Sequence, residues 1–219
     1  LYQSAACGTE VEMTSSSYAA HSLEICMGLI YIEYISRLPG VDLETFRRQA
    51  SRGQQGWDSG FEDDLVLSVG RTWRLGPDPG YMSVWHTPDA GLHRLDEWDR
   101  IFRSGEAEET EQPFFQVARI DVAGCYEPLL EPQQGRNGTY YAEYFSAYEP
   151  LEKVARFYQE RAEQHPDFVL NLLAHRIGKL APDPGGLAIW TIPDFASLAE
   201  IADELSGISR PVVLETVGT

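Results

Sequence analysis

The feature of this sequence that most constrains its fold is an internal repeat. Two stretches separated by about 105 to 110 positions carry the same short strings, YIEYIS with YAEYFS and GPDPG with APDPG. The same spacing aligns Trp85 with Trp190 and Arg71 with Arg176. A chain of 219 residues with one such repeat is predicted to consist of two copies of a single module.

Each copy predicts the same order of elements, strand, helix, strand, strand, helix, strand. A run of aromatic and β-branched residues favours the first strand in each copy, and Asp42 is placed to cap the first helix of the first copy. The Pro-Asp-Pro-Gly string favours a tight turn between the two middle strands. The predicted ranges are 28–36, 43–54, 92–103 and 114–122 in the first copy, and 138–147, a helix that follows Glu149 and Pro150 and runs through Glu163, 195–206 and 211–217 in the second.

This order is that of the ferredoxin-like fold, an α+β fold in which two helices cover one face of a four-stranded antiparallel sheet. Because the other face stays bare, the two sheets are expected to pack face to face as a barrel with a cavity between them. The predicted modules are 26–130 and 131–219. Residues 1–25 are expected to be a flexible N-terminus that begins with an expression-tag remnant, since Leu-Tyr-Gln-Ser is close to a protease site.

With this repeat and this order of elements, the chain resembles the dimeric α+β barrel superfamily in a fused tandem form, and within it the NIPSNAP-like barrels. The resemblance implies a small-molecule barrel, because members of the superfamily include cofactor-free monooxygenases, polyketide cyclases, lactone isomerases, aldoxime dehydratases and haem proteins related to chlorite dismutase. Such a range means that the fold alone does not fix the function.

Charge and composition exclude several classes of partner. The chain has 17 Lys and Arg against 34 Asp and Glu, a net charge of -17 that repels nucleic acid and anionic membranes. No apolar stretch reaches the roughly 18 residues of a membrane span, so a cytoplasmic protein is expected. The three cysteines and five histidines show neither a CxxC motif nor a zinc-type histidine pair, and no metal site is predicted.

Strand alternation supplies the candidate acid–base groups. If Ile30, Ile32 and Tyr34 face the helices, then Glu33 points into the barrel, and the same register sends Glu143 inward. A carboxyl group in an aromatic cavity has its pKa raised by desolvation, as a general acid or base near neutral pH requires. The alternative is that each glutamate pairs with an arginine, Arg71 or Arg176, or lies at a wet rim of the barrel.

Further candidates come from comparing the two copies. Trp85 and Trp190 occupy matching positions and line either the pocket or the core, whereas Tyr81 is matched by Gly186 and His175 by Gly70. Residues present in only one copy are better candidates for function than shared ones. The predicted catalytic residues are Glu33, Glu143, His86 and His175, and the predicted substrate-binding residues are Tyr31, Tyr81, Trp85, Tyr141, Trp190, Arg71 and Arg176.

These residues favour an enzyme without a cofactor that acts on a hydrophobic or aromatic, polyketide-like small molecule by cyclisation, isomerisation, elimination or oxygenation. A homodimer is compatible with this assignment. Two alternatives stay open. One is a non-catalytic NIPSNAP-like binding or stress-related barrel, and the other is a haem protein with His165 or His175 as the axial ligand.

Overall fold

The computed structural model describes residues 28–56, 64–71, 80–88, 91–105, 114–135, 138–145, 150–178, 185–199 and 209–216. Within these ranges the elements, in chain order, are β1 (Leu29–Arg37), α1 (Leu43–Gly56), β2 (Asp64–Arg71), β3 (Tyr81–Thr87), α2 (His93–Ser104), β4 (Ala118–Pro128), β5 (Thr139–Phe145), α4 (Leu151–Gln164), β6 (Val169–Arg176), β7 (Gly186–Ile192) and β8 (Ser209–Thr216). A helical segment at 195–199 stands between β7 and β8. The predicted order of elements is therefore observed both in the first half of the chain, β1 to β4, and in the second half, β5 to β8.

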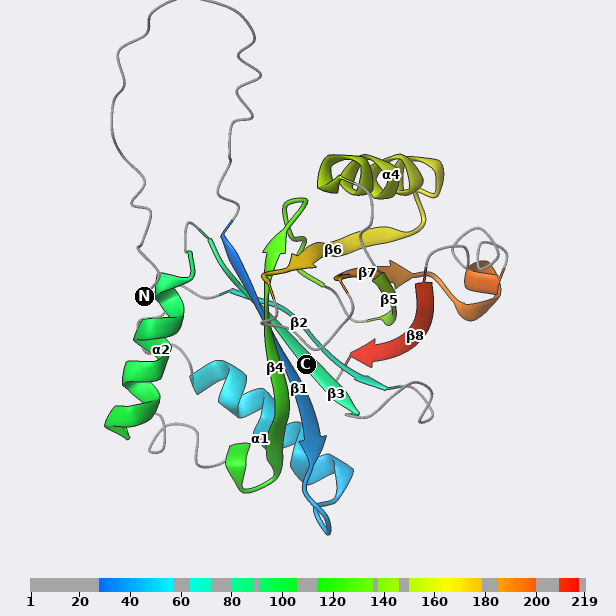
Figure 1. Ribbon diagram of the computed structural model, residues 1–219. Coiled ribbons are helices and arrows are strands. Elements are labelled where there is room, and N and C mark those ends of the chain that lie inside the picture. Colours follow the sequence, from blue (N-terminus) through cyan, green and yellow to red (C-terminus); the bar gives the residue numbers. More distant parts are fainter. Residues whose placement is uncertain are drawn as a thin grey trace, which may run out of the picture.

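The described strands close into a barrel in the order β1-β3-β2-β8-β5-β7-β6-β4 (Figure 1). In each half the order is fourth strand, first, third and second, as in a ferredoxin-like sheet. The halves meet where β2 pairs with β8 and where β4 pairs with β6, and both pairs are antiparallel. The predicted α+β barrel is confirmed at this level.

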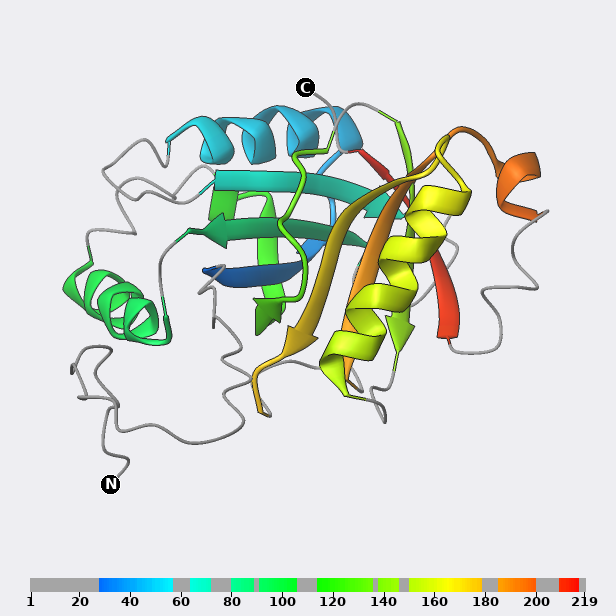
Figure 2. The same ribbon diagram turned by 90° about the horizontal axis from the view of Figure 1, so that it is seen from above.

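The helices lie outside the barrel. Figure 2 shows α1 along β2, α4 across β6 and β7, and α2 at the periphery of the first half. Asp42 caps α1 as predicted, because the backbone N–H of Thr45 donates to Asp42 Oδ1 at 2.8 Å. No helix in the described part of the chain is long and apolar enough to cross a membrane.

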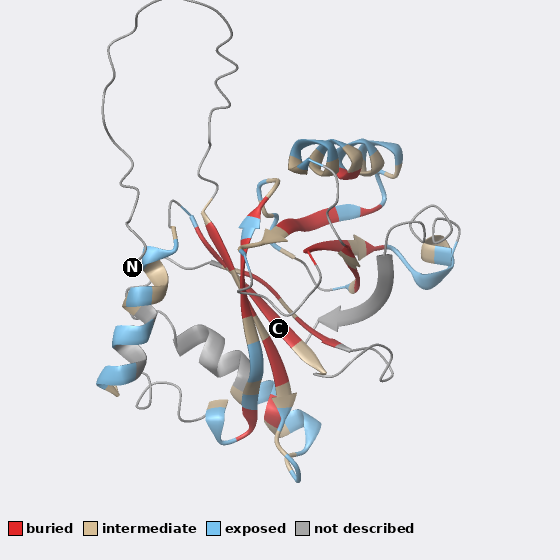
Figure 3. Cartoon of the chain, in the orientation of Figure 1, coloured by how far each residue is buried: buried red, intermediate tan, exposed pale blue. Residues whose placement is uncertain are grey.

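The interior of the barrel is a hydrophobic core shared by both halves. Its buried side chains come from strands of each half and include Ile30, Ile32, Val84, Tyr140 and Ile189, all 0 % exposed. Most residues of these strands are buried, as the burial colours show (Figure 3). The two halves are thus joined by packed apolar side chains, and this burial is the main stabilising contribution to the barrel.

The predicted facing of the first strands is wrong. Ile30, Ile32 and Tyr34 belong to the interior core, so Tyr31, Glu33 and Ile35 point outward toward the helix layer. The second half follows the same rule, with Tyr140 and Ala142 inside and Tyr141 and Phe145 outside. The placement of Glu33 and Glu143 in a cavity inside the barrel is therefore overturned.

Three smaller clusters fill the space between the barrel and its helices. One lies beneath α4 around Tyr158 and Trp190, one beneath α1 around Phe46 and Ile35, and one near α2 around Leu29 and Cys125. Because of these outer clusters, both faces of each sheet carry apolar residues.

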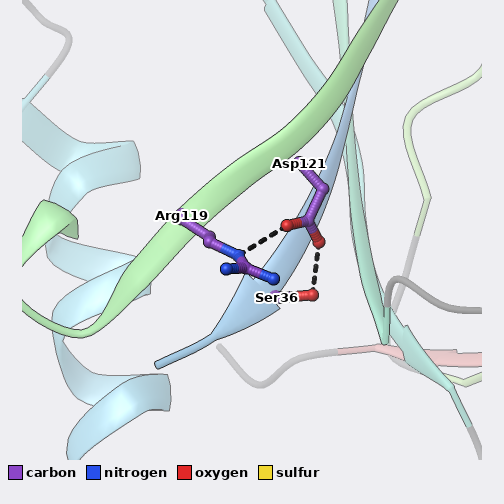
Figure 4. A network of polar contacts seen from close by, with 3 residues as sticks. All are labelled: Ser36, Arg119 and Asp121. Atoms are coloured by element: carbon purple, nitrogen blue, oxygen red, sulfur yellow. Dashed lines mark hydrogen bonds and ion pairs between the residues drawn. The ribbon is translucent and has the colours of Figure 1, made fainter. Parts of the chain in front are cut away.

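The closing strand of the first half differs from its predicted range of 114–122, since β4 begins only at Ala118 and continues to Pro128. A bulge interrupts its pairing with β1, where Tyr34 lies opposite Val122 but Ile35 lies opposite Ile120. The side chain of the extra residue, Asp121, accepts hydrogen bonds from Arg119 Nε at 2.6 Å and from the Ser36 hydroxyl (Figure 4). The hydrogen bond from Ser36 holds the bulged residue of β4 against β1.

Some predictions fall outside the described residues. These are the N-terminal segment 1–25, most of the two Pro-Asp-Pro-Gly turns at 76–80 and 181–185, and the predicted helix beyond residue 199.

Candidate functional site

The first candidate site is a patch of Tyr31, Glu33 and Trp85 on the outer face of the first half, which we call the first-half patch. Tyr31 lies opposite Trp85 and Glu33 lies opposite Ser83 in the antiparallel β1–β3 pair, so Trp85 and Glu33 are diagonal neighbours. The indole Nε1 of Trp85 donates a hydrogen bond to Glu33 Oε2 at 3.1 Å. All three side chains are half-buried, which leaves the carboxylate oriented by the protein and within reach of solvent.

Aromatic and apolar residues border this patch. On one side the ring of Tyr81 packs on Phe46 of α1, with 4.3 Å between the ring centroids. On the other side Tyr31 packs with Leu95 of α2 and with the buried Cys125. Burial raises the pKa of the Cys125 thiol to about 11, which keeps it protonated and chemically inert at neutral pH. Cys125 is therefore not a candidate acid–base group, and Glu33 is the carboxyl group of this patch.

The second half carries the same three residue types at the same register. Tyr141 lies opposite Trp190 and Glu143 lies opposite Ala188, which makes Trp190 and Glu143 diagonal neighbours as well. Here, however, the site is closed, since Glu143 is 0 % exposed and Trp190 is 3 % exposed. The indole N–H of Trp190 finds no hydrogen-bond acceptor among the described residues.

Tyr158 of α4 is what closes the second site. Its ring lies between Phe145, at 5.4 Å, and Trp190, at 6.1 Å between centroids. Burial raises the pKa of the Tyr158 phenol far above its usual range, and the interaction of its hydroxyl with the Glu143 carboxyl raises it further, whereas Arg161 opposes this shift. Tyr158 is thus a neutral phenol, and its buried hydroxyl makes no hydrogen bond among the described residues.

Arg161 lies one helical turn after Tyr158 on α4. Its guanidinium stacks over the ring of Phe157 at 4.2 Å, and its Nη1 is buried. The layer beneath α4 therefore combines a carboxyl group, a phenol, an indole N–H and a guanidinium among aromatic rings. Neither Tyr158 nor Arg161 is among the candidates that the sequence supplied.

The structure does not bring the four predicted catalytic residues together. Glu33 and Glu143 lie on the outer faces of different halves, and His86 is buried on the interior side of β3, in line with Val84. His175 is half-buried on the outer face of β6, where it lies opposite Gly186. The sheet thus separates His86 from Glu143, and the barrel separates His175 from Glu33.

The two predicted arginines differ in how far they are described. Arg176 is half-buried on the interior side of β6 and lies opposite Tyr126, on the other face of the sheet from Glu143. The side chain of Arg71, at the end of β2, lies outside the described part of the structure. The suggested pairing of Arg176 with Glu143 is therefore not what the register favours.

Comparisons with known proteins give matches at the level of structure. No family model matches the chain, and no curated protein matches its sequence. Among solved structures, a haem-binding protein from Thermus thermophilus superposes with a TM-score of 0.54 at 11 % identity, covering 86 % of this chain and 90 % of the other. A mutant chlorite dismutase from Candidatus Nitrospira defluvii, in complex with cyanide, gives 0.54 at 9 % identity, covering 86 % and 90 %. A suggested monooxygenase from Fusobacterium nucleatum gives 0.50 at 10 % identity, covering 87 % and 93 %.

These matches overturn one prediction from the sequence. We expected no cofactor, yet two of these neighbours are a haem-binding protein and a chlorite dismutase, so the comparison points to haem rather than to no cofactor.

In the layer beneath α4, haem would need an axial ligand and a flat space beside it. An axial histidine could come from His165, which follows the last residue of α4, or from His175, which lies near the end of β6. In this layer the rings of Phe145, Tyr158 and Trp190 pack against one another and fill the space between α4 and the sheet. This layer therefore does not fit haem.

The likeness is one of fold. The matched structures cover nearly the whole described chain at identities of 9 to 11 %, which is enough to establish architecture and not enough to transfer an activity. The chain shares the barrel fold of these matched structures.

Proposed function

We propose that this chain is a small-molecule enzyme whose acid–base group is Glu33 and whose substrate lies on the first-half patch. The observation that carries the proposal is the hydrogen bond from Trp85 Nε1 to Glu33 Oε2 at 3.1 Å in a half-buried setting. A general acid or base must be oriented and still reach its substrate, and Glu33 meets both conditions. Glu143 does not meet the second condition, because it is fully buried.

The chemistry available to Glu33 is the movement of a proton. As a carboxylate it removes a proton from an acidic C–H or O–H of the substrate, and as the resulting carboxylic acid it returns that proton to a neighbouring atom. Isomerisation, cyclisation and elimination all use such a step. Tyr31, Trp85 and Tyr81 supply the apolar contacts that hold a substrate ring.

The proposal also includes a common origin for the two halves. It is supported by the matching strand order and by the pairs Tyr31 and Tyr141, Glu33 and Glu143, and Trp85 and Trp190, which occupy equivalent register positions. Under this proposal the fused halves diverged, one keeping an accessible glutamate and the other burying it. A NIPSNAP-like ancestry and a homodimer remain predictions of the sequence.

Proton abstraction can be tested without knowing the substrate. Incubation of 4-hydroxyacetophenone with the protein in D₂O shows by proton NMR whether the methyl protons next to the carbonyl exchange with deuterium. We expect exchange above the buffer rate with the wild-type protein and with Glu143→Gln, and a loss of about 100-fold with Glu33→Gln. Exchange no faster than in buffer, or equal rates for wild type and Glu33→Gln, would overturn the assignment of Glu33.

Haem binding is the second candidate function, and the fold likeness to haem-binding proteins favours it. Because the layer beneath α4 is filled, haem binding requires either displacement of the Tyr158 ring or a place outside that layer. Titration of the protein with haemin should then give an absorption band near 400 nm that differs from free haemin. Loss of this band in His175→Ala or His165→Ala identifies the ligand, and its absence from the wild-type protein excludes this function.

A further inference from the structure

Two buried hydrogen-bond donors lie beneath α4. The hydroxyl group of Tyr158 and the indole N–H of Trp190 belong to side chains that are only 1 % and 3 % exposed, and neither makes a hydrogen bond within the part of the chain that the structure describes. Buried polar groups of folded proteins nearly always have a hydrogen-bond partner, either in the protein or in an ordered water molecule. These two donors therefore point to a bound molecule that accepts hydrogen bonds from them.

Both donors lie in the layer that also contains the carboxyl group of Glu143. Trp190 is the diagonal neighbour of Glu143 in the β5–β7 pair, and the ring of Tyr158 packs against Trp190 and against Phe145, two residues along β5 from Glu143. By alternation Glu143 and Phe145 face the same side of the strand. Because Glu143 is 0 % exposed, its carboxyl group is enclosed in this layer as well. The layer thus combines two donors with a carboxyl group that accepts.

The first half shows how the same pair of side chains meets directly. Trp85 and Glu33 have the same diagonal relation in the β1–β3 pair, and there the indole Nε1 donates to the carboxylate at 3.1 Å. In the second half the indole of Trp190 packs against the ring of Tyr158, with 6.1 Å between the centroids, and its N–H makes no bond to the carboxyl group. Where two polar groups stand too far apart for a direct hydrogen bond, a water molecule often bridges them.

We propose that one internal water molecule is bound beneath α4, where its oxygen accepts hydrogen bonds from Trp190 Nε1 and from the Tyr158 hydroxyl, and where it donates to the Glu143 carboxyl group. Water matches this set because it both accepts and donates, and internal water molecules typically have about three polar partners. A larger ligand would have to displace the aromatic rings that fill the layer.

The bridge joins Trp190 to Glu143 more loosely than a direct bond joins Trp85 to Glu33, because a water molecule reorients when one of its partners is changed. This site belongs to the second half, and it does not depend on the acid–base role proposed for Glu33 in the first.

The sign of one substitution is the first test. Tyr158→Phe keeps the ring and deletes only the hydroxyl group, so a hydroxyl that is bonded to water should cost the variant about 2 to 4 °C in Tm. The control is Tyr34→Phe, which should lower Tm as well, because the Tyr34 hydroxyl has the Tyr126 hydroxyl as a partner at 3.2 Å. A Tm of Tyr158→Phe equal to or above that of the wild type shows a hydroxyl without a partner and overturns the proposal.

Detection of the water molecule is the second test. In ¹⁵N-labelled protein, water-selective NOE and ROE spectra show which indole N–H groups are close to water, and signals of opposite sign in the two spectra mark a long-lived internal water molecule. We expect such signals at the indole N–H of Trp190, which is assigned by its loss in Trp190→Phe. The indole of Trp85 is the matched control, since it donates directly to Glu33 and should show no long-lived water.

Two variants separate a bound water molecule from another source of this signal. A tyrosine hydroxyl exchanges its proton with water and can relay the signal, so the signal must persist in Tyr158→Phe, where Trp190 and Glu143 still hold the water. Glu143→Leu removes the acceptor at nearly the same side-chain size, and we expect the signal to disappear. Absence of the signal from the wild-type protein, its loss in Tyr158→Phe, or its persistence in Glu143→Leu each contradicts the three-way bridge.

Discussion

Trp85 and Glu33 are joined by a hydrogen bond of 3.1 Å across diagonal positions of neighbouring strands, and the equivalent indole of Trp190 makes no such bond within the described residues. The same pair of residues thus performs two different roles in the two halves. In the first half the indole orients the carboxylate. In the second half the indole of Trp190 instead packs against the ring of Tyr158 from α4.

Double-mutant cycles should show this difference. The cycle of Trp85→Phe with Glu33→Gln is expected to give a coupling free energy of about 1 kcal/mol in urea unfolding, because it removes a hydrogen bond to a carboxylate. The cycle of Trp190→Phe with Glu143→Gln should give less than about 0.5 kcal/mol. A larger coupling in the second half than in the first contradicts the assigned hydrogen-bond pattern.

The ring of Phe145 leaves no room for a side chain at position 186. A Cβ at this position would stand 2.4 Å from Phe145 Cζ and 2.8 Å from the carbonyl oxygen of Ala174. Gly186→Ala is therefore expected to lower the free energy of unfolding by about 1 to 3 kcal/mol. Gly138→Ala is the control, since its nearest neighbour, Thr191 Cγ2, lies at an ordinary 3.6 Å, and similar losses in the two variants would refute the steric explanation.

The cap of α1 predicts a pH dependence of stability. The backbone N–H and the hydroxyl of Thr45 donate to Asp42 and hold the pKa of its carboxyl below the usual value. A lowered pKa in the folded state means that the ionised cap stabilises the protein above the unfolded pKa, and that this contribution disappears as the pH falls through the folded pKa.

Asp42→Asn keeps an acceptor at the cap but removes its charge. We expect the difference in urea midpoint between wild type and Asp42→Asn to shrink as the pH is lowered from 7 to 3. The exposed Asp167, in the turn before β6, serves as the control through Asp167→Asn. A difference that grows on acidification has the wrong sign for this cap.

Cys125 should react slowly with alkylating agents. Burial raises the pKa of its thiol to about 11, so only a small fraction is thiolate at pH 8. In a Cys7→Ser, Cys26→Ser background, iodoacetamide is expected to modify Cys125 about 100-fold more slowly than it modifies free cysteine. Leu95→Ala removes an apolar neighbour on α2 and should accelerate the reaction. Labelling of the double-serine protein as fast as free cysteine would show that the thiol is accessible.

The order of elements could be predicted from the sequence, but the facing of the strands could not. In β1 the residues on both faces are apolar or aromatic, with Ile30 and Ile32 on one face and Tyr31 and Ile35 on the other. Alternation identifies a buried face only when the opposite face is polar, and a barrel strand covered by helices has no polar face. Because the opposite face of each first strand was assigned to the barrel interior, Glu33 and Glu143 were predicted on the wrong side of the sheet.

The part played by Tyr158 was hidden for the same reason. Tyr158 is buried beneath α4. That it meets Glu143 depends on the glutamate facing α4, a long-range relation that no local pattern encodes. The two candidate sites therefore emerge only when both halves are compared in three dimensions.

The place of β8 in the barrel has a consequence for how the chain is made. Ser209–Thr216 inserts between β2 and β5, so the seam between the halves is sealed by a segment far along the chain from Val69, with which it pairs. On the ribosome, β2 and β5 emerge well before this strand and present unpaired edges to solvent or to a chaperone. Folding of the complete barrel is then expected to be slow relative to helical proteins of this size, since its last pairing closes the longest loop in the sheet.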